Sequence, residues 1–446
     1  MRLPKRPPDL GKIINDIMSG GRHEVLLHVF GRVAASHGDE RYLPWDGLRW
    51  RTPPDGLTAE EWWATVKIAR HGMQRLLPLR DATGRQFTYA LPDGVLRGIE
   101  SIDKQTSGRI SVPEPVTHDA PTRDRYVVNS LIEEAITSSQ LEGAATTYQV
   151  AKDMLRTGRK PRTRDERMIL NNYVAMRRVG EFRHERLTPA LICEIHRAVT
   201  EDTLDNVELA GRIQLPGETR VVVEDYEGNV LHMPPLAGEL PERLEQLCNF
   251  ANGASDTAYV PPVVRAVVVH FMLAYDHPFV DGNGRTARAL FYWSMLNQDY
   301  WLTEFISISS LIKKAPIKYA RSFLYSEQDE GDLTYFISYQ LEVIQRSIVD
   351  LHEYLERKVA ETRELQRSLS SLTHKFNYRQ LAVIEHALKN ANAQYTITSH
   401  AGSHNVSAQT ARTDLQGLEE QDFLTRIKSG RGFAWIPVEG IADRLR

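Results

Sequence analysis

The sequence contains very little cysteine. There are 2 cysteines in 446 residues, Cys193 and Cys248, and both stand in helix-like contexts without partners at metal-ligand spacing. A disulfide framework and a cysteine zinc site are therefore excluded, and the pattern is typical of a reducing compartment. The chain is long enough to bury a hydrophobic core without either kind of cross-link. We expect both thiols to be core or neutral surface residues.

A long uninterrupted hydrophobic run is also missing. The first residues, MRLPKRPPDL, lack the apolar core of a signal peptide. The most apolar run, VVRAVVVHFMLAY, is interrupted by Arg265 and His270 and is too short to cross a bilayer. We therefore predict no membrane contact and a soluble, cytoplasmic protein.

Neither sign of charge is in clear excess. The chain has 55 Lys and Arg against 58 Asp and Glu, a formal net charge of −3. This near balance excludes a general polyanion-binding surface, although it leaves a local basic patch open. Global charge therefore does not identify the partner.

The length predicts two or three domains, at roughly 100 to 200 residues for each. Residues 1–110 are rich in Pro, Gly and Trp and indicate a small mixed module with one helix, Thr58 to Leu77, which opens on a Thr-x-x-Glu capping box. Residues 111–365 have the apolar spacing of helices, with the catalytic core expected at 186–355. Residues 370–446 differ in character. The predicted fold class is mainly α: a helical-bundle core with a β-hairpin flap, a C-terminal winged helix and the small N-terminal module.

The stretch HPFVDGNGRTAR, residues 277–288, joins two apolar helices. The first helix is expected to end where Pro278 disfavours a helical residue before it. The Asp-Gly-Asn-Gly turn then leads into the next helix, whose unpaired N–H groups and positive dipole end form an anion site. Arg285 and Arg288 are three residues apart, so they share one side of the first turn and can grip phosphate oxygens.

Two further side chains of this stretch are of types that take part in catalysis. Asp281 is a hard oxygen ligand suited to Mg²⁺. His277 has the pKa range needed to take a proton from an attacking hydroxyl. Each residue alone could equally belong to a polar helix start, with solvated arginines and a histidine that caps the previous helix. Their combination favours a nucleotidyl or phosphoryl transfer site.

At every defined position this stretch matches H-x-F-x-[D/E]-G-N-G-R-x-x-R, the signature of the Fic family, and the chain resembles Fic proteins. The resemblance implies a helical protein adenylyltransferase, a nucleotidyltransferase that moves AMP from ATP to a Ser, Thr or Tyr hydroxyl of target proteins and of itself and releases pyrophosphate. It also implies the following roles: His277 as base, Asp281 as Mg²⁺ ligand, Gly282, Asn283 and Gly284 as anion hole, and Arg285 and Arg288 as clamps on the β- and γ-phosphates.

The segment TRVVVEDYEGNVLHMPP, residues 219–235, has β-branched runs on either side of Glu-Gly-Asn, which predicts a hairpin. By the resemblance, residues 211–235 are the flap whose edge strand aligns an extended target segment. Residues 309–324 resemble the family segment in which two adjacent tyrosines are common. Here the pair is Tyr319-Ala320, so Tyr319 is expected to bind the nucleotide, and transfer of another phosphate-linked group stays open.

Residues 125–143 predict a helix with an apolar stripe and with Gly143 as its C-terminal cap. Ser138 and Glu142 share one face of it; taken alone, Glu142 is an ordinary exposed carboxylate. The Ser-x-x-x-Glu-Gly pattern nevertheless resembles the inhibitory motif of class II Fic proteins. The resemblance implies that Glu142 forms a partly buried bidentate pair with Arg288, which a triphosphate must displace. Alternatively, Glu142 orients a water that removes AMP from a modified target.

Residues 373–438 resemble a winged helix: a helix, a helix-turn-helix with Ser407 as N-cap, and two strand-like runs around Ser-Gly-Arg-Gly. The recognition helix is expected to turn Gln409, Thr410, Arg412 and Thr413 outward, with Lys428 and Arg431 on the wing. From residue 371 onward nine Lys and Arg face seven acids, a weak basic balance for a DNA reader. DNA and a second copy of the chain are kept as partners, and a DNA-binding regulator with a secondary Fic domain is the alternative of another class.

Overall fold

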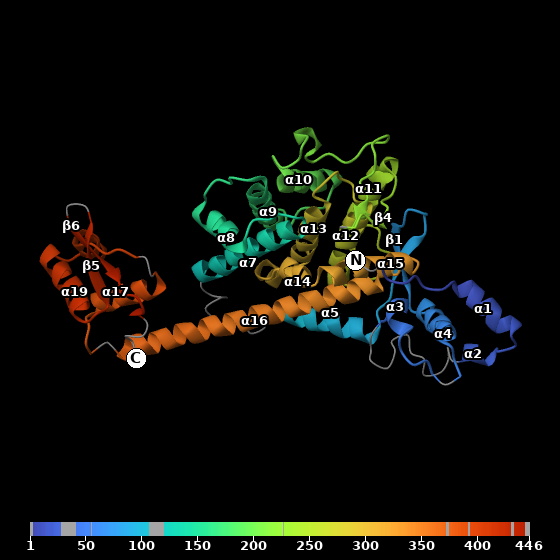
Figure 1. Cartoon of the computed structure of the whole chain (residues 1–446), viewed down its shortest axis with the longest axis horizontal. Coiled ribbons are helices and arrows are strands. Elements are labelled where there is room, and N and C mark those ends of the chain that lie inside the picture. The colour runs from blue at the N-terminus through green and yellow to red at the C-terminus, as the bar shows by residue number, and fades with distance from the viewer. Residues whose placement is uncertain are drawn as a thin grey trace. The chain divides into compact units, whose positions relative to one another are not determined.

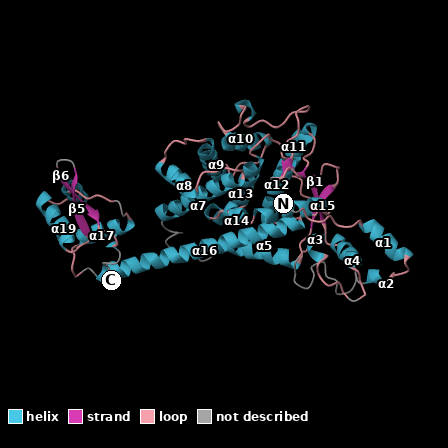
Figure 2. Cartoon of the chain, in the orientation of Figure 1, coloured by secondary structure: helices cyan, strands magenta, loops and turns pink. Residues whose placement is uncertain are grey.

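The computed structural model of the chain is mainly α-helical, as predicted (Figures 1 and 2). It describes residues 3–27, 42–54, 56–106, 120–225, 227–371, 374–390, 393–429 and 432–441. The chain divides into two compact units, Met1–His352 and Glu353–Arg446. The predicted boundary near residue 110 lies outside the described residues, and the division into three domains stays a prediction. Within the described part, no helix is long and apolar enough to cross a membrane.

The N-terminal segment combines helices with one two-stranded antiparallel sheet. Its elements are α1 (Leu10–Ser19), α2 (Glu24–Leu27), α3 (Trp45–Leu48), α4 (Ala59–His71), β1 (Arg75–Arg80), β2 (Gln86–Tyr89) and α5 (Asp93–Thr106). The predicted capping box at Thr58 is present, but the helix ends at His71 and not at Leu77. The chain leaves the helix at Gly72, and β1 then pairs with β2, so tertiary pairing overrides the helical spacing of residues 75–77.

Helix α4 is fixed to the loop before α16 by buried charges. Lys67 Nζ lies 2.8 Å from Asp329 Oδ1, and their side chains are 3% and 5% exposed. Arg70 donates to the Tyr335 hydroxyl at 2.9 Å, which itself donates to Asp329 Oδ2 at 2.6 Å. The N-terminal segment thereby supports the end of α15, which forms a wall of the cavity described below.

The remaining helices of the first unit surround α12 and α13, which are buried over nearly their whole length. The elements are α7 (Ala120–Leu141), α8 (Tyr148–Thr157), α9 (Arg164–Glu181), α10 (Pro189–Thr200), α11 (Leu240–Ala251), α12 (Pro262–Asp276), α13 (Asn283–Asn297), α14 (Ile308–Lys314), α15 (Pro316–Gln328) and α16 (Thr334–Ser371), with 3₁₀ turns at Val207–Leu209, Ala237–Glu239 and Trp301–Phe305. The helix expected from VVRAVVVHFMLAY is therefore confirmed, and its all-round apolar surface is explained by its central place.

The predicted hairpin is also present. Strands β3 (Val223–Glu224) and β4 (Val230–His232) pair antiparallel. Asp225 closes the turn, since its Oδ1 accepts the backbone N–H of Asn229 at 3.0 Å. The strands are shorter than the β-branched runs in the sequence, and residues 219–222 belong to no strand.

The second unit contains the end of α16 and then α17 (Tyr378–Lys389), α18 (Ile397–His404), α19 (Ala408–Glu420), β5 (Leu424–Ser429) and β6 (Gly432–Pro437). This is the predicted order of elements, and Ser407 caps α19 by accepting from the Thr410 N–H. Gln409, Arg412 and Thr413 are exposed and Thr410 is half-buried. Arg431 lies outside the described residues.

Candidate active site

The loop between α12 and α13 is held in one conformation by its own residues. His277 ends α12 with a φ of 46°, and Gly282 precedes α13 with a φ of 81°. The Asn283 side chain closes the loop, since it accepts from the Phe279 N–H at 2.9 Å and donates to the Phe279 carbonyl at 2.7 Å. Asn283 is therefore a structural brace, and the backbone N–H groups of the α13 N-terminus are left for an anion.

His196 of α10 supports this loop, and no local feature of the sequence had indicated it. Its ring stacks on Phe279 with centroids 3.7 Å apart. Its Nδ1 accepts the Gly211 N–H at 2.9 Å, so its Nε2 carries the proton and donates to the Asp281 carbonyl at 2.8 Å. Burial lowers the pKa of His196 to about 4. A neutral, fixed imidazole thus holds the backbone next to the expected metal ligand.

His277 has the properties of a general base. Burial lowers its pKa to about 4, so the ring is neutral near pH 7. Its Nδ1 lies 3.3 Å from the Ala274 carbonyl. Since a carbonyl only accepts, this contact favours the tautomer protonated at Nδ1, which leaves the lone pair on Nε2 free to accept a proton.

Arg285 is fully buried with part of its hydrogen-bonding capacity unused. Its Nη1 donates to the Val199 carbonyl at 2.7 Å, and its Nη2 lies 3.7 Å from Asp281 Oδ1. Its Nε and Nη2 are among the buried atoms of the described residues that have no hydrogen-bond partner. A buried cation with unfilled donors is costly unless an anion completes it, so this position fits a phosphate.

Arg288 is buried and is held by α7. Its Nε donates to Ser138 Oγ at 2.8 Å, and its Nη2 contacts the Ser138 carbonyl at 3.0 Å and Glu142 Oε1 at 2.8 Å. The predicted Glu142–Arg288 contact is therefore present, but it is not bidentate. Ser138 takes the donors that a second carboxylate oxygen would have used. A Cβ added to Gly284 would overlap Glu142 Oε1, which puts the carboxylate directly against the first turn of α13.

Helix α7 is fixed in this position by a second carboxylate that the sequence had not singled out. Glu134 is buried, one turn before Ser138. It accepts from the Tyr292 hydroxyl at 2.9 Å, from Ser307 Oγ at 2.8 Å and from the Ser309 N–H at 3.1 Å. Helix α7 then ends at Leu141, and Gly143 has a φ of 94°, which agrees with its predicted capping role.

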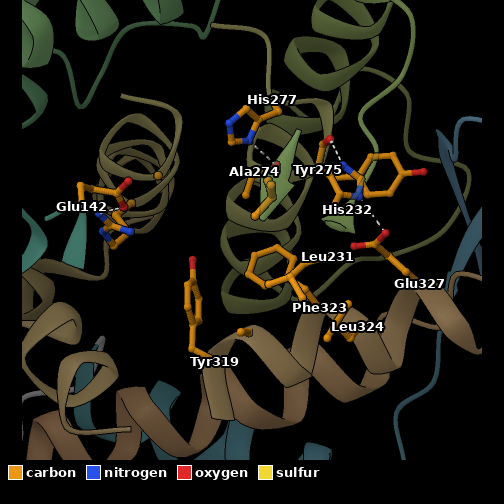
Figure 3. Close-up of a pocket in the computed structure, with 14 residues that line it drawn as sticks. Glu142, Leu231, His232, Ala274, Tyr275, His277, Tyr319, Phe323, Leu324 and Glu327 are labelled. Carbon is orange, nitrogen blue, oxygen red and sulfur yellow. Dashed lines mark hydrogen bonds and ion pairs between the residues drawn. The ribbon is translucent and has the colours of Figure 1, made fainter. Parts of the chain in front are cut away.

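A cavity of about 210 Å³ opens between Glu142, the flap and α15 (Figure 3). Its lining is largely apolar and includes Leu231, Phe323 and Ala320. Tyr319 points into it from α15, and its hydroxyl lies 2.9 Å from His270 Nε2. Burial raises the pKa of Tyr319 to about 12. The cavity thus joins an apolar end, suited to a planar base, to the cationic end at Arg288.

Asp281 is the acid of the loop itself, directly before Gly282. Its side chain is 43% exposed, and its Oδ1 accepts the Gly282 N–H at 2.5 Å. Over the described parts of the chain, no group of three metal-ligating side chains comes together. Mg²⁺ keeps several waters and takes its other ligands from phosphates, so a single half-exposed carboxylate is enough to hold it. A metal that needs all its ligands from the protein fits this site less well.

Comparison with known proteins agrees with this geometry. Residues 186–295 match the sequence model of the Fic/DOC family. The chain is 35% identical over 118 residues to protein adenylyltransferase fic-1 of Caenorhabditis elegans, a match that covers 26% of this chain and 21% of that protein. It is 29% identical over 203 residues to protein adenylyltransferase Fic of Nematostella vectensis, covering 43% of each. The chain therefore matches less than half the length of either relative.

Solved structures of similar fold include the following protein. It is a Fic family protein from Desulfovibrio desulfuricans, with a TM-score of 0.50, 16% sequence identity, and coverage of 78% of this chain and 97% of that chain. At this identity the likeness concerns the fold alone, and it agrees with the mainly α architecture.

Proposed function

We propose that this chain, in which residues 186–295 form a Fic/DOC domain, is a protein adenylyltransferase that transfers AMP from ATP to a hydroxyl side chain of a target protein. The observation that carries the proposal is the buried guanidinium of Arg285 at the start of α13, in which two nitrogens have no hydrogen-bond partner, in the same loop segment as the neutral His277. The relatives named protein adenylyltransferase support the same activity.

The residues of the loop fit each step of this transfer. Nε2 of His277 takes the proton of a Ser, Thr or Tyr hydroxyl, and the oxygen attacks the α-phosphorus of ATP. The bond from that phosphorus to the bridging oxygen breaks, and pyrophosphate leaves with the electron pair. Arg285, Arg288 and the N–H groups of Asn283 and Gly284 stabilise the charge that develops on the phosphate oxygens.

Asp281 is the residue that would hold Mg²⁺. The ion would supply positive charge to the phosphates when bound. His196 contributes indirectly, because it fixes the Asp281 carbonyl and keeps the carboxylate at the mouth of the anion site.

Glu142 acts as a built-in inhibitor in this proposal. Its carboxylate competes for Arg288 with the γ-phosphate, and it lies against Gly284 where phosphate oxygens would approach. ATP then binds without the in-line geometry, and the wild type is nearly inactive. The resemblance to class II Fic proteins gives the same assignment to Ser138, Glu142 and Gly143.

The test is self-labelling of the full-length chain with ATP labelled on the α-phosphate, in the presence of Mg²⁺. We expect strong labelling of Glu142→Gly and almost none of the wild type. Glu133→Gln removes a carboxylate from the same helix away from Arg288, so it should behave as wild type. Equal labelling of wild type and Glu142→Gly would refute the inhibition, and labelling that survives His277→Ala in the Glu142→Gly background would refute the base.

The lining of the cavity bears on which nucleotide the site accepts. Ala320 lines the cavity where a second tyrosine is common in the family, which leaves room for a base other than adenine. Competition of unlabelled GTP, CTP and UTP against labelled ATP would measure this preference. Removal of AMP from the labelled chain by the wild type would instead assign Glu142 to the reverse reaction.

A further inference from the structure

The flap is attached to α12 and α15 through the ring of His232. His232 lies on β4, its side chain is 8% exposed, and its Nδ1 lies 2.7 Å from Glu327 Oε2 of α15. Its Nε2 lies 2.6 Å from the Tyr275 carbonyl of α12. Figure 3 shows the ring between these two partners, on the side of the cavity opposite Glu142. One side chain therefore joins three elements that line the cavity.

Both partners of this ring are pure acceptors. A neutral imidazole carries one proton, so it could donate to Glu327 or to the Tyr275 carbonyl but would turn a lone pair toward the other. Only the imidazolium, which carries a proton on each nitrogen, satisfies both contacts. Both distances lie within hydrogen-bond range, so each ring nitrogen faces an acceptor.

Arg220, on the chain that enters the flap, makes a parallel attachment. Its Nη2 donates to the Asp276 carbonyl at 2.7 Å and contacts the His277 carbonyl at 3.2 Å, while its Nε donates to the Pro235 carbonyl at 2.7 Å. The Asp276 and His277 carbonyls lie at the end of α12, which leaves them without helical partners. His232 and Arg220 thus both attach the flap region to backbone carbonyls at the end of α12, close to His277.

We propose that His232 is a positioning residue: as an imidazolium bridged between Glu327 and the Tyr275 carbonyl, it holds the flap at a fixed distance from His277. The edge strand β3 is paired to β4, so a target segment added to β3 would be registered against the base through this bridge. Loss of the second proton breaks one of the two contacts and lets the flap open.

Other ionisable groups lie close to the ring. They are Glu327 on α15, Tyr275 and Asp276 on α12, His277 at the end of α12, Arg243 on α11 and Arg220 before β3. Asp276 is the one that complicates a pH experiment, because burial raises its pKa to about 6 while Arg243 Nε lies 2.7 Å from it. The experiment therefore compares variants that share Asp276.

Glu327→Gln isolates the effect of the second proton. The glutamine amide can donate to a neutral Nδ1 while Nε2–H still donates to the Tyr275 carbonyl, so both contacts survive without the charge. Glu218→Gln is the matched control, because it neutralises a carboxylate of the loop before β3 whose partner is Arg212.

The first readout is hydrogen–deuterium exchange of the peptides that cover residues 220–235, measured on the full-length wild type and corrected for the intrinsic rate. We expect protection to fall roughly tenfold in the wild type and in Glu218→Gln when the pH is raised until the second ring proton is lost, the size of one charge-assisted hydrogen bond. In Glu327→Gln it should change less than about twofold over the same range. The same pH dependence in all three proteins would overturn the proposal.

The second readout is activity, and it rests on the proposed adenylyl transfer. In the Glu142→Gly background, His232→Gln should lower the self-labelling rate roughly tenfold while the KM for ATP stays within about twofold. A KM for ATP that rises in step with the loss of rate would show that His232 binds nucleotide, and would refute the positioning role. If no variant is labelled, the proposed function fails, while the exchange experiment still tests the bridge.

Discussion

Gly282 permits a quantitative test of the anion loop. It has a φ of 81°, and a Cβ there would approach Thr200 Cγ2 to 2.6 Å. The backbone conformation costs a residue with a Cβ about 1 kcal/mol, and the overlap costs about 1–3 kcal/mol more. Gly282→Ala should therefore lower the free energy of unfolding by about 2–4 kcal/mol and distort the N–H groups that receive the phosphates.

The steric part can be separated from the backbone part. Thr200→Ser removes Cγ2 and keeps the hydroxyl that donates to the His196 carbonyl at 2.7 Å, at a cost of about 0.5–1.5 kcal/mol. In the double variant the overlap is gone, so the two substitutions should be non-additive by about 1–3 kcal/mol. Gly84→Ala is the control, because Gly84 has a φ of 86° and nothing within 4 Å of the added Cβ.

The assay is urea denaturation followed by tryptophan fluorescence, combined with the labelling rate in the Glu142→Gly background. Gly84→Ala should lose about 1 kcal/mol and keep the labelling rate. Additivity of Gly282→Ala and Thr200→Ser to within about 0.5 kcal/mol would refute the steric account. An equal loss of stability in Gly84→Ala and Gly282→Ala would refute it as well.

Four further predictions concern pH and the second unit. Labelling by Glu142→Gly should persist to about pH 5 and halve near pH 4, because the base His277 has a pKa of about 4 and acts in its neutral form; a midpoint above pH 6 would contradict this. The pKa of His277 in the folded chain lies below the unfolded value of about 6.5. The stability held by the neutral ring is therefore complete above pH 6.5 and should be lost as the pH falls from 6.5 to about 4. Melting temperatures measured as a function of pH would show this loss. Asp414→Ala should destabilise the second unit by about 2–4 kcal/mol in urea, because buried Asp414 accepts from Arg379 Nε at 2.6 Å, and Asp414→Asn should recover part of the loss. Should α19 read DNA, Arg412→Ala will weaken a salt-dependent gel shift, whereas absence of any shift at low salt would exclude that partner.

The sequence was sufficient for features that depend on neighbouring residues. The helix before His277, the turn at Gly282, the caps at Thr58 and Ser407 and the hairpin at 219–235 all follow from local backbone and side-chain chemistry. The loop that carries the expected chemistry was therefore predictable in residues and in shape.

Contacts between distant segments were not predictable in the same way. His196 supports Asp281 from 85 positions away, and Glu134 anchors α7 to residues more than 150 positions later. Neither has a neighbour in sequence that marks it. The expected bidentate pair at Arg288 was wrong for a related reason, because spacing puts Ser138 and Glu142 on one face but does not say which of them receives each donor.

The buried ions under α15 determine how much of the chain is needed for a working domain. A version shortened to begin after residue 90 would keep the whole signature loop but lose Lys67 and Arg70. Asp329 would then remain buried without a cation. Breaking a buried ion pair in this way lowers the free energy of unfolding by about 3–5 kcal/mol. The smallest stable fragment therefore has to include Lys67 and Arg70, whose charges balance buried Asp329 at the end of α15. It begins far upstream of residues 186–295, which match the family.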